Sequence, residues 1–169
     1  MPPLSFTLSQ ASSHGVRPRL WQRQLIQLLR ARVGPGAAGA QPAPQDVLVH
    51  AGPGAGKTLG ALLGFSQLKR ELHLDRFVVF CHRSSIAQQW LSAGERLQLR
   101  LHPWEEARHD PGADGWLVSY QSSGRHRQQL LELLSRERLG RWMAIADEVH
   151  HLGLDPEEPE AAAWGPAFS

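Results

Sequence analysis

Residues 51–58 read AGPGAGKT, and the predicted fold is organised around this stretch. It follows the apolar run at residues 47–49 (VLV), which predicts a buried strand, and it precedes residues 59–63 (LGALL), which predict a helix. A strand, a glycine-rich turn and a helix form the context that a phosphate-binding loop requires. Gly54 and Gly56 allow the backbone to curl so that successive N–H groups point into one concavity.

The helix that begins near Lys57 adds the positive end of its dipole to this concavity. Lys57 can reach the β- and γ-phosphates of a nucleotide, and the Thr58 hydroxyl can hold Mg²⁺. The first position of the loop is Ala51 where the motif usually has glycine, and a glycine-rich turn without a ligand is the alternative interpretation. The predicted nucleotide-binding residues in the loop are Gly54, Ala55, Gly56, Lys57 and Thr58.

Length and composition indicate one globular domain in a reducing compartment. A chain of 169 residues buries roughly 70% of its unfolded surface when it folds as one domain. No apolar run approaches the ~20 residues that a membrane span needs, and residues 1–17 lack the pattern of a secretory signal. The lone Cys81 excludes an internal disulfide and favours the cytoplasm.

The net charge of +2 hides an asymmetry along the chain. Residues 1–100 carry 12 Lys and Arg against 4 Asp and Glu, whereas residues 101–169 carry 6 against 12. A basic first half suits contact with a nucleic-acid backbone. A solvated, arginine-rich surface explains the same charge equally well.

Helical and strand patterns alternate along the rest of the chain. Residues 1–16 predict a loose arm, residues 17–169 one domain, and residues 34–45 (GPGAAGAQPAPQ) a surface connector. The apolar spacing predicts helices over 19–32, 84–97 and 126–138, and strands over 76–81, 115–120 and 142–146. Apolar strands that alternate with helices predict an α/β fold, in which a parallel sheet has helices on both faces.

The strand at residues 142–146 places Asp147 and Glu148 at its carboxyl end, where ligands bind in such sheets. A carboxylate opposite a phosphate loop can hold Mg²⁺, usually through water, and we assign this role to Asp147. Glu148 would orient and deprotonate the water that attacks the γ-phosphate, while Lys57 and the metal offset the developing charge. The sequence therefore predicts an ATP and Mg²⁺ site with catalytic Lys57 and Glu148 and with Thr58 and Asp147 at the metal. The alternative interpretation of the Asp-Glu pair is a solvated loop end.

AGPGAGKT together with DEVHHL (residues 147–152) resembles motifs I and II of the superfamily-two helicases and translocases, in the DExH division. Residues 78–90 (VVFCHRSSIAQQW) resemble their motif Ia, and residues 118–122 (VSYQS) are similar to a segment of the restriction-enzyme and excision-repair-like branch. The resemblance covers residues 17–152. It implies a RecA-like, phosphate-loop NTPase fold and the activity of an ATP-dependent DNA helicase or translocase.

The resemblance also implies a residue that reads adenine. In the family, a glutamine just after an aromatic residue upstream of motif I has this role, and Trp21-Gln22 fits it. The usual Arg-Pro pair stands two residues too early, as Arg17-Pro18. Gln24 therefore stays an alternative to Gln22, and so does a surface role for both.

Motif Ia and the Y-Q-S segment touch the phosphate backbone of one strand in these proteins. Such contacts position nucleic acid without reading its sequence. Ordinary surface and helix-end roles are the alternative, above all for the basic and amide side chains of motif Ia. The positions that carry over to this chain are Arg83, Ser84, Gln89, Tyr120 and Gln121.

Relatives continue past motif II with a further helix, a strand with a Ser-Ala-Thr type motif and a second RecA-like domain. That domain supplies an arginine finger and half of the nucleic-acid track, whereas this sequence runs through DPEEPE and AAAWGPAFS and ends. The resemblance thus implies a partial first RecA-like domain, residues 17–169, which on its own binds ATP with little turnover. An inactive nucleotide-binding remnant or interaction module is one alternative. Another phosphate-loop ATPase, such as a AAA-type machine, is a second, and motif Ia and Trp21-Gln22 argue against it.

Overall fold

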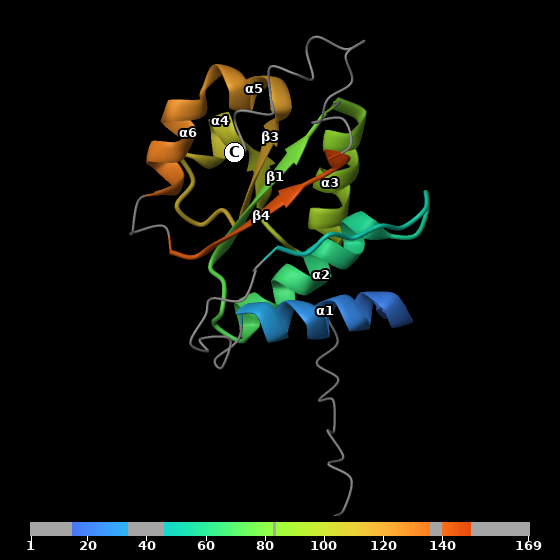
Figure 1. Cartoon of the computed structure of the whole chain (residues 1–169). Helices are drawn as coiled ribbons and strands as arrows, with labels where there is room; N and C mark the ends of the chain where they lie inside the picture. The colour runs from blue at the N-terminus through green and yellow to red at the C-terminus, as the bar shows by residue number, and fades with distance from the viewer. Residues whose placement is uncertain (1–14, 34–45, 83, 136–139, 150–169) are drawn as a thin grey trace, which may run out of the picture.

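A computed structural model describes residues 15–33, 46–82, 84–135 and 140–149. Its sheet contains β1 (Arg76–Cys81), β2 (Leu101–Pro103), β3 (Gly115–Ser119) and β4 (Trp142–Ala146). All neighbouring strands pair in parallel, and their spatial order is β2-β3-β1-β4 (Figure 1). Phe80 of β1 lies opposite Val118 of β3 and Ala146 of β4. The predicted parallel sheet is confirmed.

Helices cover both faces of this sheet, as predicted (Figure 1). One face packs against α1 (Leu20–Val33), α2 (Lys57–Arg70) and α3 (Ser84–Arg96). The other face packs against α4 (Trp104–Ala107), α5 (Tyr120–Arg125) and α6 (Arg127–Leu134). No helix within the described ranges combines the length and apolar character that a membrane span requires.

The side chains of β1 explain why its sequence is a continuous apolar run after Arg76. Phe77, Val79 and Cys81 belong to the core under α1, α2 and α3. Val78 and Phe80 point the other way and join the core under α4, α5 and α6. Because successive side chains of a strand alternate between faces, a strand covered on both faces is apolar at every position.

Two glycines of α2 let α1 pack directly on its backbone. A Cβ atom on Gly60 would lie 2.8 Å from Cη2 of Trp21, and one on Gly64 would lie 2.7 Å from Cδ1 of Leu29. Leu25 and Leu29 of α1 are both buried. This close approach brings the first turn of α1 to the loop that precedes α2.

The strand predicted at residues 47–49 is wrong. Residues 46–50 have no regular secondary structure, and Leu48 is 82% exposed. A parallel strand needs a hydrogen-bonded neighbour. In the described part of the chain, β2 and β4 are the edge strands of the sheet, and no strand pairs with residues 47–49.

Several short elements differ from the prediction. β2 and α4 were not predicted, because runs of three and four residues are too short for a periodic signal. The strand predicted to reach Tyr120 ends at Ser119, whose hydroxyl oxygen accepts a hydrogen bond from Ser122 N at 3.0 Å and caps α5. The helix predicted over 126–138 is α6. The predicted arm, apart from residues 15 and 16, and the connector lie outside the described residues.

We expect Gly60→Ala to unfold at a lower urea concentration than the wild type. Overpacking a core costs about 1–3 kcal/mol, which outweighs the gain of up to ~1 kcal/mol from replacing glycine within a helix. The control is Gly64→Ala, because its added methyl meets only the end of the Leu29 side chain, which can rotate. Equal unfolding midpoints for the two variants would contradict the close packing of α1 on α2 at Gly60.

Candidate nucleotide-binding site

The glycine-rich loop has the backbone conformation that its sequence predicts. Gly54 has φ 72° and Gly56 has φ 85°, a left-handed region in which other residues are strained. Gly56 is the N-cap of α2, and no side chain from the described residues caps this helix. The first N–H groups of a helix lack partners within the helix and attract anions. The loop and the start of α2 therefore have the geometry of a phosphate site.

The start of α1 and Arg19, the residue just before it, hold the loop through the loop's carbonyl oxygens. Arg19 Nη1 donates to the oxygens of Gly54 and Ala55, at 3.2 and 2.9 Å. Trp21 Nε1 donates to the Ala55 oxygen at 3.1 Å. The Trp21 ring is therefore a hydrogen-bonding group as well as a packing group. Sequence reasoning missed the roles of Arg19 and of this indole N–H.

Gln22 completes this set of contacts. Its Nε2 donates to the Gly56 oxygen at 3.0 Å, and its Oε1 accepts from Arg19 N at 2.8 Å. Gln22 is 1% exposed, whereas Gln24 on the same helix is exposed. Of the two glutamines proposed from the sequence, the structure places Gln22 against the phosphate loop.

These contacts also orient the loop's donors. In a planar trans peptide the C=O of one residue and the N–H of the next point in opposite directions. Since the carbonyls of Ala55 and Gly56 face α1, the N–H groups of Gly56 and Lys57 point away from it. Arg19, Trp21 and Gln22 together form a clamp on the loop. This clamp holds the N–H groups of Gly56 and Lys57 in the direction that a phosphate requires.

The acidic pair lies beside the phosphate loop, as predicted from the carboxyl-end rule. Lys57 Nζ and Glu148 Oε1 are 3.7 Å apart, and each side chain is about one-third exposed, at 36% and 30%. Glu148 has φ 56°, a conformation that costs energy in a residue other than glycine and that recurs at functional sites. The ion pair joins the two ends of the candidate site across 91 residues of sequence, from position 57 to position 148.

Asp147 is held by three hydrogen bonds from three elements. Its N donates to the Phe80 oxygen at 2.9 Å, and its own carbonyl oxygen accepts from the Tyr120 hydroxyl at 2.8 Å. Its Oδ2 accepts from Trp90 Nε1 at 2.8 Å. The sequence predicted a metal-binding role for Asp147 but gave no sign of Trp90, since a tryptophan on the apolar side of a helix usually indicates a core residue.

The Tyr120 side chain is fully buried, at 0% exposure. Burial, aided by the nearby Asp147 carboxylate, raises the pKa of Tyr120, so its hydroxyl stays a neutral donor. The same two causes raise the pKa of Cys81 to about 11, and this thiol is a protonated core group. The predicted contact of the Tyr120 side chain with nucleic acid is corrected, because in this structure the side chain points inward to Asp147.

Three of the other predicted nucleic-acid residues lie on the surface. Ser84 and Gln89 of α3 and Gln121 of α5 are exposed. Ser84 and Gln121 follow shortly after Cys81 and Ser119, which are paired neighbours in β1 and β3. These two polar residues therefore lie at the carboxyl edge of the sheet. Arg83 is outside the described residues.

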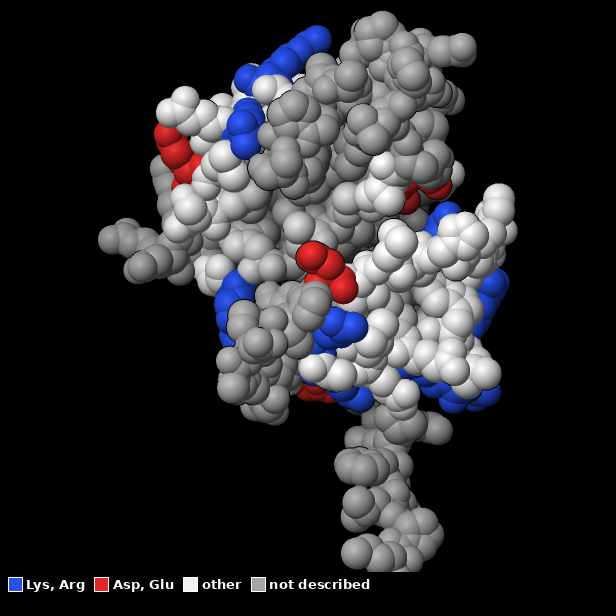
Figure 2. Space-filling model, viewed as in Figure 1, with Lys and Arg blue, Asp and Glu red and all other residues white. Residues whose placement is uncertain are grey.

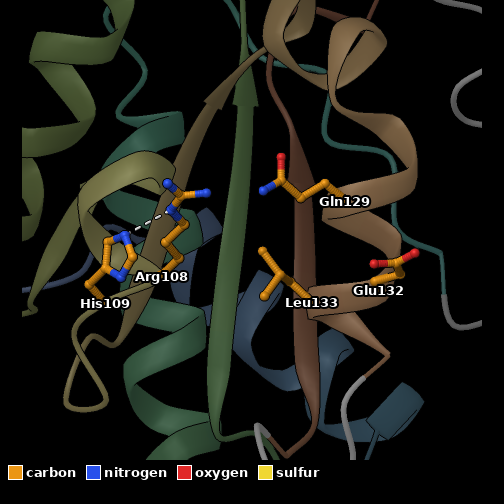
Figure 3. Close-up of a pocket in the computed structure, with 5 residues that line it drawn as sticks. All are labelled: Arg108, His109, Gln129, Glu132 and Leu133. Carbon is orange, nitrogen blue, oxygen red and sulfur yellow. Dashed lines mark hydrogen bonds between the residues drawn. The ribbon is translucent and has the colours of Figure 1, made fainter.

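A separate cleft of about 410 Å³ lies between α4 and α6. Figure 3 shows Arg108 and His109 on one side of it and Gln129, Glu132 and Leu133 on the other. Arg108 Nε is 3.0 Å from His109 Nε2. None of the five lining residues belongs to the phosphate loop or to the acidic pair, so this cleft is distinct from the candidate nucleotide site.

A parallel sheet with a glycine-rich loop at the start of α2 and an acidic pair after β4 defines the class of phosphate-loop NTPases. Residues 15–164 match the family described as "Type III restriction enzyme, res subunit". The chain belongs to this family, whose N-terminal domain is helicase-like.

The sequence is also similar to an uncharacterized protein of Mycobacterium leprae (strain TN), with 29% identity over 170 residues. This alignment covers 98% of the chain and 25% of the relative, so the chain spans about a quarter of the length of that curated protein. No solved structure matches the chain.

We expect Gln22→Ala to destabilise the domain more than Gln24→Ala in urea unfolding, because Gln22 is buried and Gln24 is exposed. Gln22→Ala removes both part-buried hydrogen bonds of a side chain that is 1% exposed, and each such bond contributes about 0.5–1.5 kcal/mol net to the free energy of unfolding. Gln24→Ala should stay within about 0.5 kcal/mol of the wild type, as is usual for surface positions. Both changes replace glutamine by alanine in α1, so helix propensity cancels in the comparison. Equal urea midpoints would contradict the role of Gln22 in the clamp.

Proposed function

We propose that this chain is the ATP-binding domain of an ATP-dependent DNA helicase or translocase of the DExH division. In the whole protein it would couple ATP hydrolysis to movement along nucleic acid. The observation that supports this most directly is the 3.7 Å approach of Lys57 to Glu148, which places the phosphate loop beside the acidic pair. The helicase-like character of the family supports the nucleic-acid part of the proposal.

The residues present fit a nucleotide with Mg²⁺. The N–H groups of Gly56 and Lys57 face away from α1 and would bind the phosphates together with the start of α2. The Thr58 hydroxyl and the Asp147 carboxylate are oxygen ligands of the kind that Mg²⁺ takes. When bound, the metal would offset negative charge on the phosphates.

Lys57 and Glu148 would divide the catalytic work. Lys57 would exchange its ion pair with Glu148 for the γ-phosphate and stabilise the charge that develops there. Glu148 would orient the attacking water and accept its proton. Its positive φ of 56° is the kind of backbone strain that recurs at functional sites and supports this assignment.

Gln22 is the better candidate for contact with adenine. It lies against the phosphate loop, while Gln24 faces solvent. An amide offers both a donor and an acceptor to the edge of the base. The Gln22 side chain is 1% exposed, so it would have to become accessible before its amide could pair with the base.

Nucleic acid would bind through its backbone at the carboxyl edge of the sheet. We assign contacts to Ser84, Gln89 and Gln121 and, from the sequence alone, to Arg83. Figure 2 shows separate basic groups with acidic side chains between them on the described part of one face, without a continuous basic band. In the family, one RecA-like domain supplies only half of the nucleic-acid track, so affinity from this domain alone should be weak. A second RecA-like domain of the whole, cytoplasmic protein would supply the remaining track and an arginine finger.

Lys57→Ala should abolish the thermal stabilisation that ATP and Mg²⁺ give to the chain. At a nucleotide concentration of 100 Kd, binding stabilises by about 2.7 kcal/mol, which raises Tm by about 5–10 °C in a domain of this size. The control is Lys69→Ala, since Lys69 lies at the other end of α2 and pairs with Asp114. An equal response of the wild type and Lys57→Ala would refute the site.

Binding of single-stranded DNA should weaken steeply with salt and be insensitive to sequence. Arg83→Ala should lower the slope of log affinity against log salt by about one. Arg108→Ala, in the cleft between α4 and α6, is the control and should leave the slope unchanged. A slope that Arg83→Ala does not alter would remove Arg83 from the proposed track.

A further inference from the structure

The indole of Trp90 differs from the other buried tryptophans of this domain. Trp90 is 2% exposed, and its Nε1 donates to Asp147 Oδ2 at 2.8 Å. The indole N–H groups of Trp104, Trp116 and Trp142 are also buried, yet they have no hydrogen-bond partner within the described residues. Trp90 therefore does more than fill the core, because its polar atom is paired with a carboxylate at the candidate site.

The hydrogen bond from Trp90 restrains the Asp147 carboxylate, which can still rotate when the main chain of this residue is held. The Phe80 carbonyl and the Tyr120 hydroxyl hold the two sides of the Asp147 main chain. With the main chain held, the carboxylate can still turn about its side-chain bonds. A hydrogen bond to Oδ2 from the rigid indole, which is packed in the core, restricts this rotation.

We propose that Trp90 is a positioning residue for the Mg²⁺ site. By holding Oδ2, it would fix the orientation of the Asp147 carboxylate, which is one of the two oxygen ligands proposed for Mg²⁺. This inference rests on the proposed function. Groups that orient a metal's ligands from the second shell typically contribute 10- to 100-fold to metal affinity.

The same bond links the metal site to helix α3. Gln89, the neighbour of Trp90, is exposed on the side of α3 that we assign to nucleic acid, while Trp90 faces the core. A shift of α3 relative to β4 would lengthen the bond between Trp90 and Asp147.

The decisive measurement is the effect of Mg²⁺ on ADP affinity in Trp90→Phe. Calorimetric titrations with excess Mg²⁺ and with EDTA give the factor by which the metal tightens ADP binding. In Trp90→Phe this factor should fall about 10-fold, while the affinity in EDTA stays that of the wild type. The matched control is Trp116→Phe, which removes an equally buried indole without a partner and should keep the full factor.

If Mg²⁺ tightens ADP binding by the same factor in Trp90→Phe as in the wild type, the inference is overturned while the proposed nucleotide site remains intact. Absence of Mg²⁺-dependent ADP binding in the wild type would instead overturn the proposed function and this inference with it. Equal losses with and without metal would indicate a structural role for Trp90 and would also overturn the inference.

A second measurement does not depend on the stability of Trp90→Phe. In a ¹⁵N–¹H spectrum with assigned indole signals, Asp147→Asn should move the Trp90 signal upfield, because a bond to a charged acceptor becomes a weaker bond to a neutral one. The signal of Trp116 should stay in place. An unmoved Trp90 signal would show that the bond is absent in solution and would refute the positioning role.

Discussion

The parallel pairing of β1 with β3 and β4 is the constraint on which the site depends. Since the three strands run in one direction, Cys81, Ser119 and Ala146 all end at the same edge of the sheet. Three parts of the candidate sites follow these strand ends: the start of α3, the start of α5 and the acidic pair. An antiparallel strand at any of these positions would have carried its functional residues to the opposite edge.

The phosphate loop is located in a different way. Residues 46–50, which lead into it, form no strand, so the sheet does not hold the loop from that side. Its position comes from the packing of α2 on the sheet and from the donors of α1 on its carbonyls. Because α1 can approach α2 this closely only at glycine, Gly60 contributes to the loop's geometry without belonging to it.

Much of this architecture is predictable from the sequence, and the misses have physical causes. The long periodic segments, the glycine-rich loop and the placement of Asp147 and Glu148 were predicted because each depends on local pattern. The strand at residues 47–49 was wrong since a strand depends on a neighbour that composition does not reveal. The inward direction of the Tyr120 side chain and the bond from Trp90 to Asp147 were not predicted, because sequence shows what a side chain can bond and only packing shows where it points.

Trp90 and Tyr120 both donate to Asp147, one to its carboxylate and the other to its main-chain carbonyl. Each sits on a helix that starts at the carboxyl edge, beside polar residues that face outward. A neutral hydrogen bond contributes about 0.5–1.5 kcal/mol net and one to a charged group about 1.5–3. The Trp90 bond is therefore the stronger of the two. Its loss would leave the Asp147 carboxylate without this restraint, whereas after loss of the Tyr120 bond the Phe80 carbonyl would still hold the Asp147 main chain.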